Sequence, residues 1–324
     1  MEETRDHGGN LDAAMARWGG EMADWVDLST GINRLPYPVP EIPARAWQAL
    51  PTRSDMARLV AAARSAYGSS ADIVPVAGAQ AAIQSVPFLR APGVARVLSP
   101  TYNEHAAALR MGGWLVTEVD TVLDLTGAEL AVIVSPNNPD GRRFAPEALR
   151  DLAMRVGMLV VDESFGDARP EATVARFVLP ENVLVLRSFG KFYGLAGVRL
   201  GFALGHGPLV DRLRAMAGPW PVSGPAIQIA CAALDDTAWQ AKTVARLHGD
   251  CARMDRLAQA AGWRLVGGTE LFRTYDTLDA SHAQEWLAEA RVWSRIFPYS
   301  GTWIRLGLPA PQEWAQVEAA LTAV

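Results

Sequence analysis

The chain has 324 residues, half of them hydrophobic and a fifth charged, which predicts a globular protein with one large and one smaller domain and excludes a disordered or fibrous chain. Its formal charge of −5 gives no basis for general nucleic-acid binding. The start of the chain is polar and no apolar run approaches the roughly 20 residues of a membrane span, so we expect a cytoplasmic protein with no membrane partner.

The first forty residues are irregular and contain several glycines and prolines, and they predict an N-terminal arm, residues 1–40, that packs on a small C-terminal domain. From residue 41 helices and strands alternate. We expect helices over 43–68 (with turn signals inside), 78–91, 103–113 and 146–157, and strands over 94–100, 128–136, 158–164, 182–189 and 197–204. Continuous apolar strands separated by helices predict an α/β domain, residues 41–215, with a mostly parallel sheet covered on both faces.

The remaining residues, 216–324, predict long helices over 225–262 and a small α+β domain. Its short strands are expected over 263–268, 271–277 and 302–309, around a helix over 281–292. Ser281 and Gln284 have the spacing of a capping box at the start of that helix. Cys231 and Cys251 are the only cysteines and form no C-x-x-C pair, so we expect neither a disulfide framework nor a metal site.

Polar side chains with complementary chemistry stand where the predicted strands end, which is where ligands bind in an open α/β sheet. Asn137 and Asn138 follow one strand, Asp162 comes near the end of the next, and Lys191 follows a third. A partly desolvated lysine can form a Schiff base, and Lys191 and Lys242 are the only lysines in the chain.

These groups match what pyridoxal 5′-phosphate requires of a protein. An aspartate can keep the pyridine nitrogen protonated and an asparagine can bind the ring oxygen. Arg199, which we expect just inside the strand over 197–204, can cradle the phosphate. Ser188 and the backbone N–H groups at Gly78, Ala79 and Gln80 complete the predicted cradle.

Three segments carry a family resemblance: S-F-G-K-F-Y-G around Lys191, S-P-N-N-P-D-G over 135–141 and V-V-D-E-S-F over 160–165. In order and spacing they resemble the fold-type-I, class I/II aminotransferases, which depend on pyridoxal phosphate and usually form homodimers. The resemblance implies Lys191 as the Schiff-base lysine, Asp162 as the partner of the pyridine nitrogen and Asn138 at the ring hydroxyl. It also implies that Tyr102 stacks on the ring and that Arg305 binds the substrate carboxylate.

The chain departs from the family pattern at three places. Phe165 stands where many relatives have Tyr, and Gly190 replaces the Ser that usually precedes the lysine. The tyrosine expected near Leu50 is absent, and Arg53 is the candidate substitute. We therefore expect some ring and phosphate contacts of the family to be replaced.

The N-terminal arm indicates which branch of this family the chain resembles. H-G-G-N over 7–10 and D-L-S-T-G-I-N over 27–33 are similar to the threonine-phosphate decarboxylases of cobalamin biosynthesis, a branch near the histidinol-phosphate aminotransferases. This implies decarboxylation of L-threonine O-3-phosphate to (R)-1-amino-2-propanol O-2-phosphate. The substrate-binding residues would be His7, Asn33, Asn138, Arg295 and Arg305, with the two arginines on neighbouring strands.

Two other functions remain open. A histidinol-phosphate aminotransferase or related aminotransferase would use the same residues and break a different bond, because the bond that is cleaved is the one held perpendicular to the cofactor ring. A non-catalytic relative would bind the cofactor without turnover, although the presence of both Lys191 and Asp162 speaks against it.

Overall fold

The computed structural model describes residues 7–322, so residues 1–6 of the predicted arm lie outside the described part. The chain divides into two compact units. Among the described residues, unit 1 comprises 7–36, 139–141 and 241–322, and unit 2 comprises 37–138 and 142–240. The division falls after residue 240, whereas the sequence suggested a boundary at 215/216, because the helix over 224–235 packs against the helix over 53–67 in unit 2.

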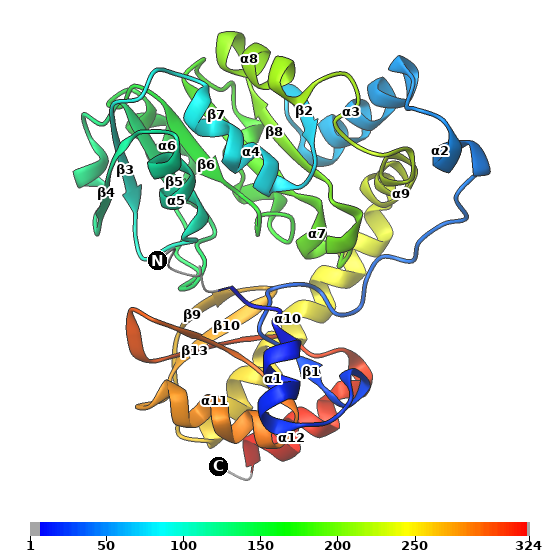
Figure 1. Ribbon diagram of the computed structural model, residues 1–324, viewed down its shortest axis with the longest axis vertical. Coiled ribbons are helices and arrows are strands. Elements are labelled where there is room, and N and C mark those ends of the chain that lie inside the picture. Colours follow the sequence, from blue (N-terminus) through cyan, green and yellow to red (C-terminus); the bar gives the residue numbers. More distant parts are fainter. Residues whose placement is uncertain (1–6, 323–324) are drawn as a thin grey trace. The chain divides into compact units, whose positions relative to one another are not determined.

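Unit 2 is built on a seven-stranded sheet with the order β2-β8-β7-β6-β5-β3-β4 (Figure 1). Its strands are β2 (Asp72–Val76), β3 (Val94–Leu98), β4 (Leu115–Val119), β5 (Leu130–Val134), β6 (Leu159–Asp162), β7 (Val183–Ser188) and β8 (Gly201–Gly205). Only β8 runs antiparallel to its neighbours, β2 and β7, and the other pairs are parallel. The predicted mostly parallel α/β fold is therefore confirmed.

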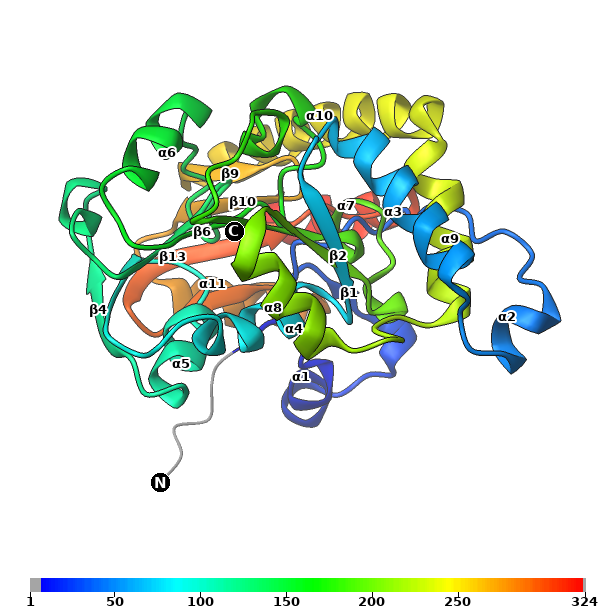
Figure 2. The ribbon, with the colours of Figure 1, turned by 90° about the horizontal axis from the view of Figure 1, so that it is seen from above.

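Helices cover both faces of this sheet, which explains why β5 and β6 are buried along their whole length. Figure 2 shows α4, α5 and α8 on one face and α3, α6 and α9 on the other. The helices of unit 2 are α2 (Ala44–Gln48), α3 (Arg53–Tyr67), α4 (Ala79–Ser85), α5 (Glu104–Met111), α6 (Pro146–Ala153), α7 (Phe189–Phe192), α8 (Gly207–Ala217) and α9 (Gly224–Asp235).

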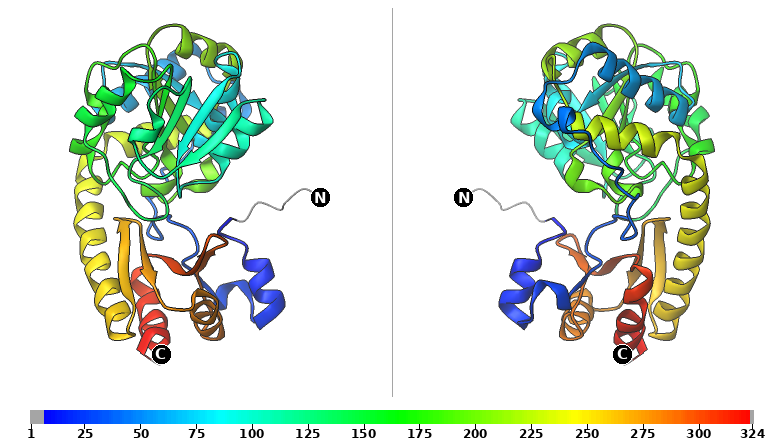
Figure 3. Two further views of the ribbon diagram at one scale, coloured as in Figure 1. Left: turned by 90° about the vertical axis from the view of Figure 1, so that its left-hand side faces the viewer. Right: turned by 90° about the vertical axis from the view of Figure 1, so that its right-hand side faces the viewer.

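Unit 1 contains a four-stranded sheet in the order β12-β13-β10-β9. Its strands are β9 (Arg264–Thr269), β10 (Phe272–Asp276), β12 (Arg295–Phe297) and β13 (Ser300–Gly307), and a separate parallel pair joins β1 (Val26–Asp27) to β11 (Val292–Trp293). Its helices are α1 (Leu11–Trp18), α10 (Thr237–Ala260, which begins in unit 2), α11 (Ala280–Glu289) and α12 (Trp314–Thr322). Figure 3 shows α10 and α11 on opposite faces of this sheet.

The long helices expected over 225–262 are α9 and α10. Asp236 ends α9, and its carboxylate accepts a hydrogen bond from the backbone N–H of Trp239 in α10. The predicted capping box does not form: α11 begins at Ala280, and Asp279, two residues before Ser281, caps it by accepting the N–H of His282. Ser281 therefore lies inside the helix.

Within residues 7–322 no helix is both long enough and apolar enough to cross a membrane. The same residues contain no group of three or more His, Cys, Asp or Glu side chains placed to hold a metal ion.

Candidate active site

The carboxyl ends of β5, β6 and β7 form one edge of the large sheet. Asp162 is the last residue of β6 and lies in register with Val134 of β5 and Leu186 of β7. Asn137 and Asn138 follow β5, and Ser188 is the last residue of β7. The parallel register thus brings these predicted site residues to one edge, as their positions after strands implied.

Asp162 is buried, and its carboxylate is held from two sides. Its Oδ2 lies 2.9 Å from Nε2 of His105, and its Oδ1 accepts the backbone N–H of Ser164 at 2.9 Å. Burial by itself raises the pKa of Asp162, but the hydrogen bonds and the positive charge available on His105 outweigh it and hold the pKa below its ordinary value. Such a carboxylate stays ionised, as the partner of a protonated pyridine nitrogen must.

His105 is a residue that the sequence analysis missed. It lies in the first turn of α5 and is buried, and its ring meets that of Tyr102 edge to face at 6.3 Å between centroids. The Tyr102 hydroxyl in turn donates to Oε1 of Gln80 at 3.2 Å. The only sequence signal was a single histidine near the start of a helix, which is more often a core residue than a site residue.

Lys191 lies in the short helix α7, three residues after β7 ends. Its Nζ lies 5.5 Å from the centre of the Phe165 ring, so the phenylalanine that replaces the family tyrosine contacts the lysine. A Cβ on Gly190 would lie 2.7 Å from Cα of Ala196. The loop that follows α7 therefore has no room for a serine at 190, which explains that departure from the family pattern.

The predicted phosphate cradle gathers at the start of α4. Gly78 caps this helix, and a Cβ there would lie 2.7 Å from Nη2 of Arg199, so the guanidinium lies directly over the glycine. Arg199 precedes β8 in a left-handed conformation (φ 54°), which corrects the expectation that it lies inside the strand. This turn aims the exposed guanidinium toward the helix terminus, where backbone N–H groups favour an anion.

The side chain of Gln80 does not belong to the cradle. Its Nε2 donates to the buried carboxylate of Glu104 at 2.8 Å, while its Oε1 accepts from Tyr102. Gln80 can therefore serve a phosphate only through its backbone. Asn137 is engaged in the same way: its Oδ1 accepts from Thr101 and its Nδ2 donates to the Pro100 carbonyl. Asn138, the other amide side chain that follows β5, is half-buried and is the candidate for the ring hydroxyl of the cofactor.

These residues fit pyridoxal phosphate. A buried, ionised carboxylate, a lysine beside an aromatic ring and an arginine at a helix N-terminus offer one group for each of the ring nitrogen, the aldehyde and the phosphate.

In unit 1 most of the H-G-G-N motif has a structural role. Gly8 approaches the carbonyl of Ser29 so closely that a Cβ would overlap it. Gly9 has φ +88° and donates its N–H to Oγ of Ser29 at 2.7 Å, and Asn10 caps α1. Only His7, which is exposed, is left as a candidate for chemistry from this motif.

Ser29 links the arm to Arg305. Nη2 of the buried Arg305 donates to the Ser29 carbonyl at 2.6 Å, and Oγ of Ser29 donates to Asp27 at 2.6 Å. Arg295 of β12 is the register partner of Arg305 in β13, so the prediction of neighbouring strands is confirmed. Burial and the positive charge of Arg295 lower the pKa of Arg305 to about 10, and a bound anion would relieve the repulsion between them.

Asn33 is buried, and its side chain has a fixed direction. Its Oδ1 accepts from Nη2 of Arg246 at 2.6 Å and from the backbone N–H of Leu35 at 3.1 Å. Arg246 is itself held by Asp250 at 2.8 Å. With the oxygen engaged, the Nδ2 donor is the part of Asn33 that can serve an anion.

The comparisons with known proteins agree with this geometry. A family model described as aminotransferase class I and II matches residues 49–324. The chain is 42% identical to a threonine-phosphate decarboxylase of Pseudomonas aeruginosa, covering 98% of this chain and 97% of that protein, and 41% identical to one of a Sinorhizobium species, covering 93% and 92%.

Among solved structures, the histidinol-phosphate aminotransferase of Sinorhizobium meliloti, in complex with pyridoxal-5′-phosphate, matches with a TM-score of 0.83 at 19% identity, over 99% of this chain and 95% of that one. That likeness establishes the fold. The family model covers most of the chain, and both decarboxylases match it along nearly their whole length. The chain belongs to the aminotransferase class I and II family.

Proposed function

We propose that this protein is a pyridoxal-phosphate-dependent decarboxylase that converts L-threonine O-3-phosphate to (R)-1-amino-2-propanol O-2-phosphate, a step of cobalamin biosynthesis. The observation that carries the proposal is the similarity of 41–42% to two threonine-phosphate decarboxylases, which extends through the arm and the small unit. Matches to histidinol-phosphate aminotransferases are weaker, for example 26% over 94% of the chain for one from Mesorhizobium japonicum.

Pyridoxal phosphate, when bound, supplies a ring that withdraws electrons from the bond to be broken. In the proposal Lys191 holds the cofactor aldehyde and Asp162, fixed by His105, keeps the ring nitrogen charged. Arg199, Ser188 and the start of α4 hold its phosphate, and Asn138 binds the ring hydroxyl. Tyr102, braced by Gln80, stacks on the ring.

The substrate is an amino acid with an anion at each end, and unit 1 offers cationic and N–H donor groups. Arg305 binds the carboxylate, while Arg295, His7 and the Nδ2 of Asn33 bind the phosphate. Holding both ends would limit rotation about the Cα bonds of the substrate, and the orientation of these bonds would select the one that is broken. Binding energy from the phosphate thereby contributes to the reaction rate.

The test is a product assay with L-threonine O-3-phosphate and no oxo acid. We expect one carbon dioxide for each aminopropanol phosphate, and with plain L-threonine a loss of both kcat and affinity. A keto acid and pyridoxamine phosphate without carbon dioxide, or turnover of histidinol phosphate with 2-oxoglutarate, would make the protein an aminotransferase. Cofactor binding without turnover of either substrate would make it a non-catalytic relative.

A substrate-side variant separates phosphate recognition from catalysis. We expect His7→Ala to raise KM for phosphothreonine more than for threonine, because only the former presents a phosphate. His282→Ala, an exposed histidine of α11, is the matched control and should change neither.

We also propose a homodimer in the cytoplasm. Trp47 in α2 is 69% exposed and Leu50, two residues after α2, is 62% exposed, and large exposed apolar side chains are typical of an interface. Both cysteines are free thiols, as expected in a reducing compartment.

A further inference from the structure

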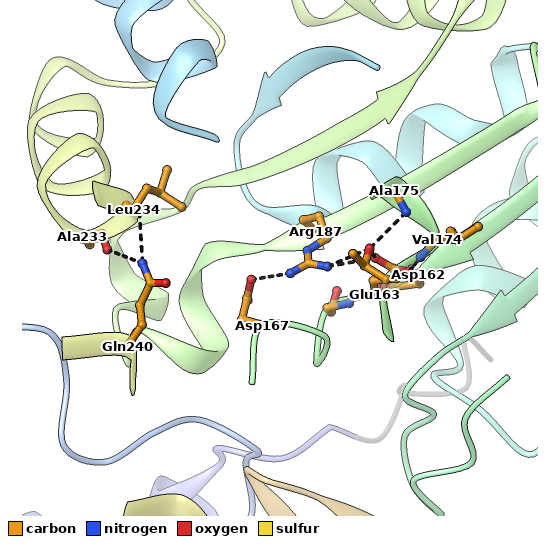
Figure 4. Close-up of polar contacts among 11 residues, drawn as sticks. Asp162, Glu163, Asp167, Val174, Ala175, Arg187, Ala233, Leu234 and Gln240 are labelled. Carbon is orange, nitrogen blue, oxygen red and sulfur yellow. Dashed lines mark hydrogen bonds and ion pairs between the residues drawn. The ribbon is translucent and has the colours of Figure 1, made fainter. Parts of the chain in front are cut away.

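The six residues over 162–167 connect two of the groups assigned above. Asp162 stands at one end, and Phe165, whose ring contacts Lys191, lies between two further carboxylates, Glu163 and Asp167. Neither Glu163 nor Asp167 has a part in the proposed chemistry. Both bind the same buried guanidinium, that of Arg187 in β7 (Figure 4).

The contacts of Arg187 are direct and buried. Its Nη1 lies 2.9 Å from Oε2 of Glu163, and its Nη2 lies 2.6 Å from Oδ1 of Asp167. The side chains of all three residues are at most 5% exposed. The guanidinium carbon of Arg187 also lies 4.4 Å from the centre of the Tyr67 ring, and this contact helps to orient the guanidinium plane.

Glu163 has further anchors. Its Oε1 accepts the backbone N–H of Val174 at 2.8 Å, and the Thr173 hydroxyl donates to its Oε2. Its own backbone N–H donates to the Leu186 carbonyl of β7 at 2.8 Å. The start of the segment is therefore held to β7 and to the turn at 173–175, whereas Asp167 at its other end is held by Arg187.

A contribution to folding stability is by itself a weak explanation for the buried cluster of Arg187, Glu163 and Asp167. Two buried carboxylates share one guanidinium, and burial raises the pKa of both Glu163 and Asp167 against the opposing effect of Arg187. A buried ion pair can often be replaced by apolar side chains at no loss of stability. What apolar side chains would not supply is the directional hold on both ends of one short segment.

We propose that Arg187, through Glu163 and Asp167, is a positioning residue that fixes the segment 162–167 and with it the carboxylate of Asp162 and the ring of Phe165 against Lys191. Arg187 precedes Lys191 by four residues, so one side chain connects the end of β7, which leads into α7 and Lys191, to the segment that follows Asp162. The inference rests on the roles proposed for Asp162 and Lys191 and is independent of which bond the enzyme breaks.

The decisive variant is Asp167→Asn in the cofactor-loaded protein, because it removes one charge and keeps the shape. We expect visible circular dichroism of the bound cofactor to weaken, the Kd for pyridoxal phosphate to rise and kcat to fall, each by about three-fold or more, with KM changed less than two-fold. Thr173→Val leaves every charge in place and removes one of the hydrogen bonds that hold Glu163, and we expect the same changes at smaller size.

Asp255→Asn is the matched control, since Asp255 binds Arg273 and Tyr275 within unit 1. We expect it to lower Tm without changing the cofactor dichroism or Kd. If Asp167→Asn and Thr173→Val lower Tm as the control does and leave dichroism, Kd and kcat unchanged, the cluster is structural and the proposal is wrong. If Asp167→Asn does not fold, the cofactor dichroism, Kd and kcat of Thr173→Val test the proposal instead.

Failure of the underlying site assignment gives a different result. In that case Lys191→Ala would keep the visible band of the bound cofactor. A band lost in Lys191→Ala together with unchanged dichroism in Asp167→Asn would overturn only the role of Arg187.

Discussion

Lys191 and Lys242 are the only lysines of the chain, so the attachment of the cofactor can be tested by two single substitutions. We expect Lys191→Ala to abolish the visible absorbance of the lysine-bound cofactor and the activity, because no other amine lies in α7. Lys242→Ala, an exposed position on α10, should keep both. Loss of absorbance and activity in Lys242→Ala, with both kept in Lys191→Ala, would show that the cofactor is attached to Lys242.

Asp162 is the residue proposed to keep the pyridine nitrogen of the cofactor protonated. Asp162→Asn keeps the size of the side chain and removes the charge, so we expect a folded protein whose kcat is lower by roughly two orders of magnitude or more. Circular dichroism in the far ultraviolet checks the fold, and steady-state kinetics check the rate. A variant with near wild-type kcat would contradict the assignment.

His105 is one of the two residues that hold the pKa of Asp162 below its ordinary value, so we expect it to contribute to the acid stability of the cofactor-free protein. Because the folded-state pKa of Asp162 is lowered, its contribution to stability is present above the ordinary carboxyl pKa and is lost as the pH falls through the lowered value. His105→Gln removes one source of the lowering, so acid unfolding should begin at a higher pH. His282→Gln, on the surface of α11, should leave the midpoint unchanged.

At the scale of elements, the arm depends on contact between the backbone at Gly8 and Ser29. Gly8→Ala places a methyl group into the Ser29 carbonyl, which also accepts from Arg305. We expect a rise of about ten-fold or more in KM for phosphothreonine with little loss of cofactor affinity, since the residues proposed to bind the cofactor lie in unit 2. Gly301→Ala, where a Cβ meets nothing within 4 Å, is the control. An unchanged KM in Gly8→Ala would show that the arm takes no part in substrate binding.

For the whole molecule, the exposed apolar side chains at α2 predict self-association. We expect the wild-type protein to sediment as a dimer and Trp47→Glu to sediment as a monomer, because a buried charge opposes the interface. Met154→Glu, at a side chain 77% exposed at the end of α6, should remain dimeric. A wild-type protein that is monomeric at all concentrations would overturn the proposed homodimer.

The sequence was sufficient for the buried strands and for the positions of Asn138, Asp162, Ser188 and Lys191. Continuous apolar runs mark strands covered on both faces, and residues placed after parallel strands must meet at one edge of the sheet. It was not sufficient for the two edge strands of the large sheet. β2 is largely buried but contains Pro75, which argues against a strand, and β4 has a largely exposed, mixed pattern because an edge strand has only one neighbour.

Only the tertiary structure decided the contacts that tune these residues. His105 reaches Asp162 across 57 residues, and Arg305 reaches Ser29 across 276. Periodicity, capping and turn signals reflect interactions between residues a few positions apart. They therefore predict where helices and strands begin and end. The partner of a buried charge depends instead on which elements pack together, and that choice brought Arg187 between Glu163 and Asp167 and set Arg295 beside Arg305.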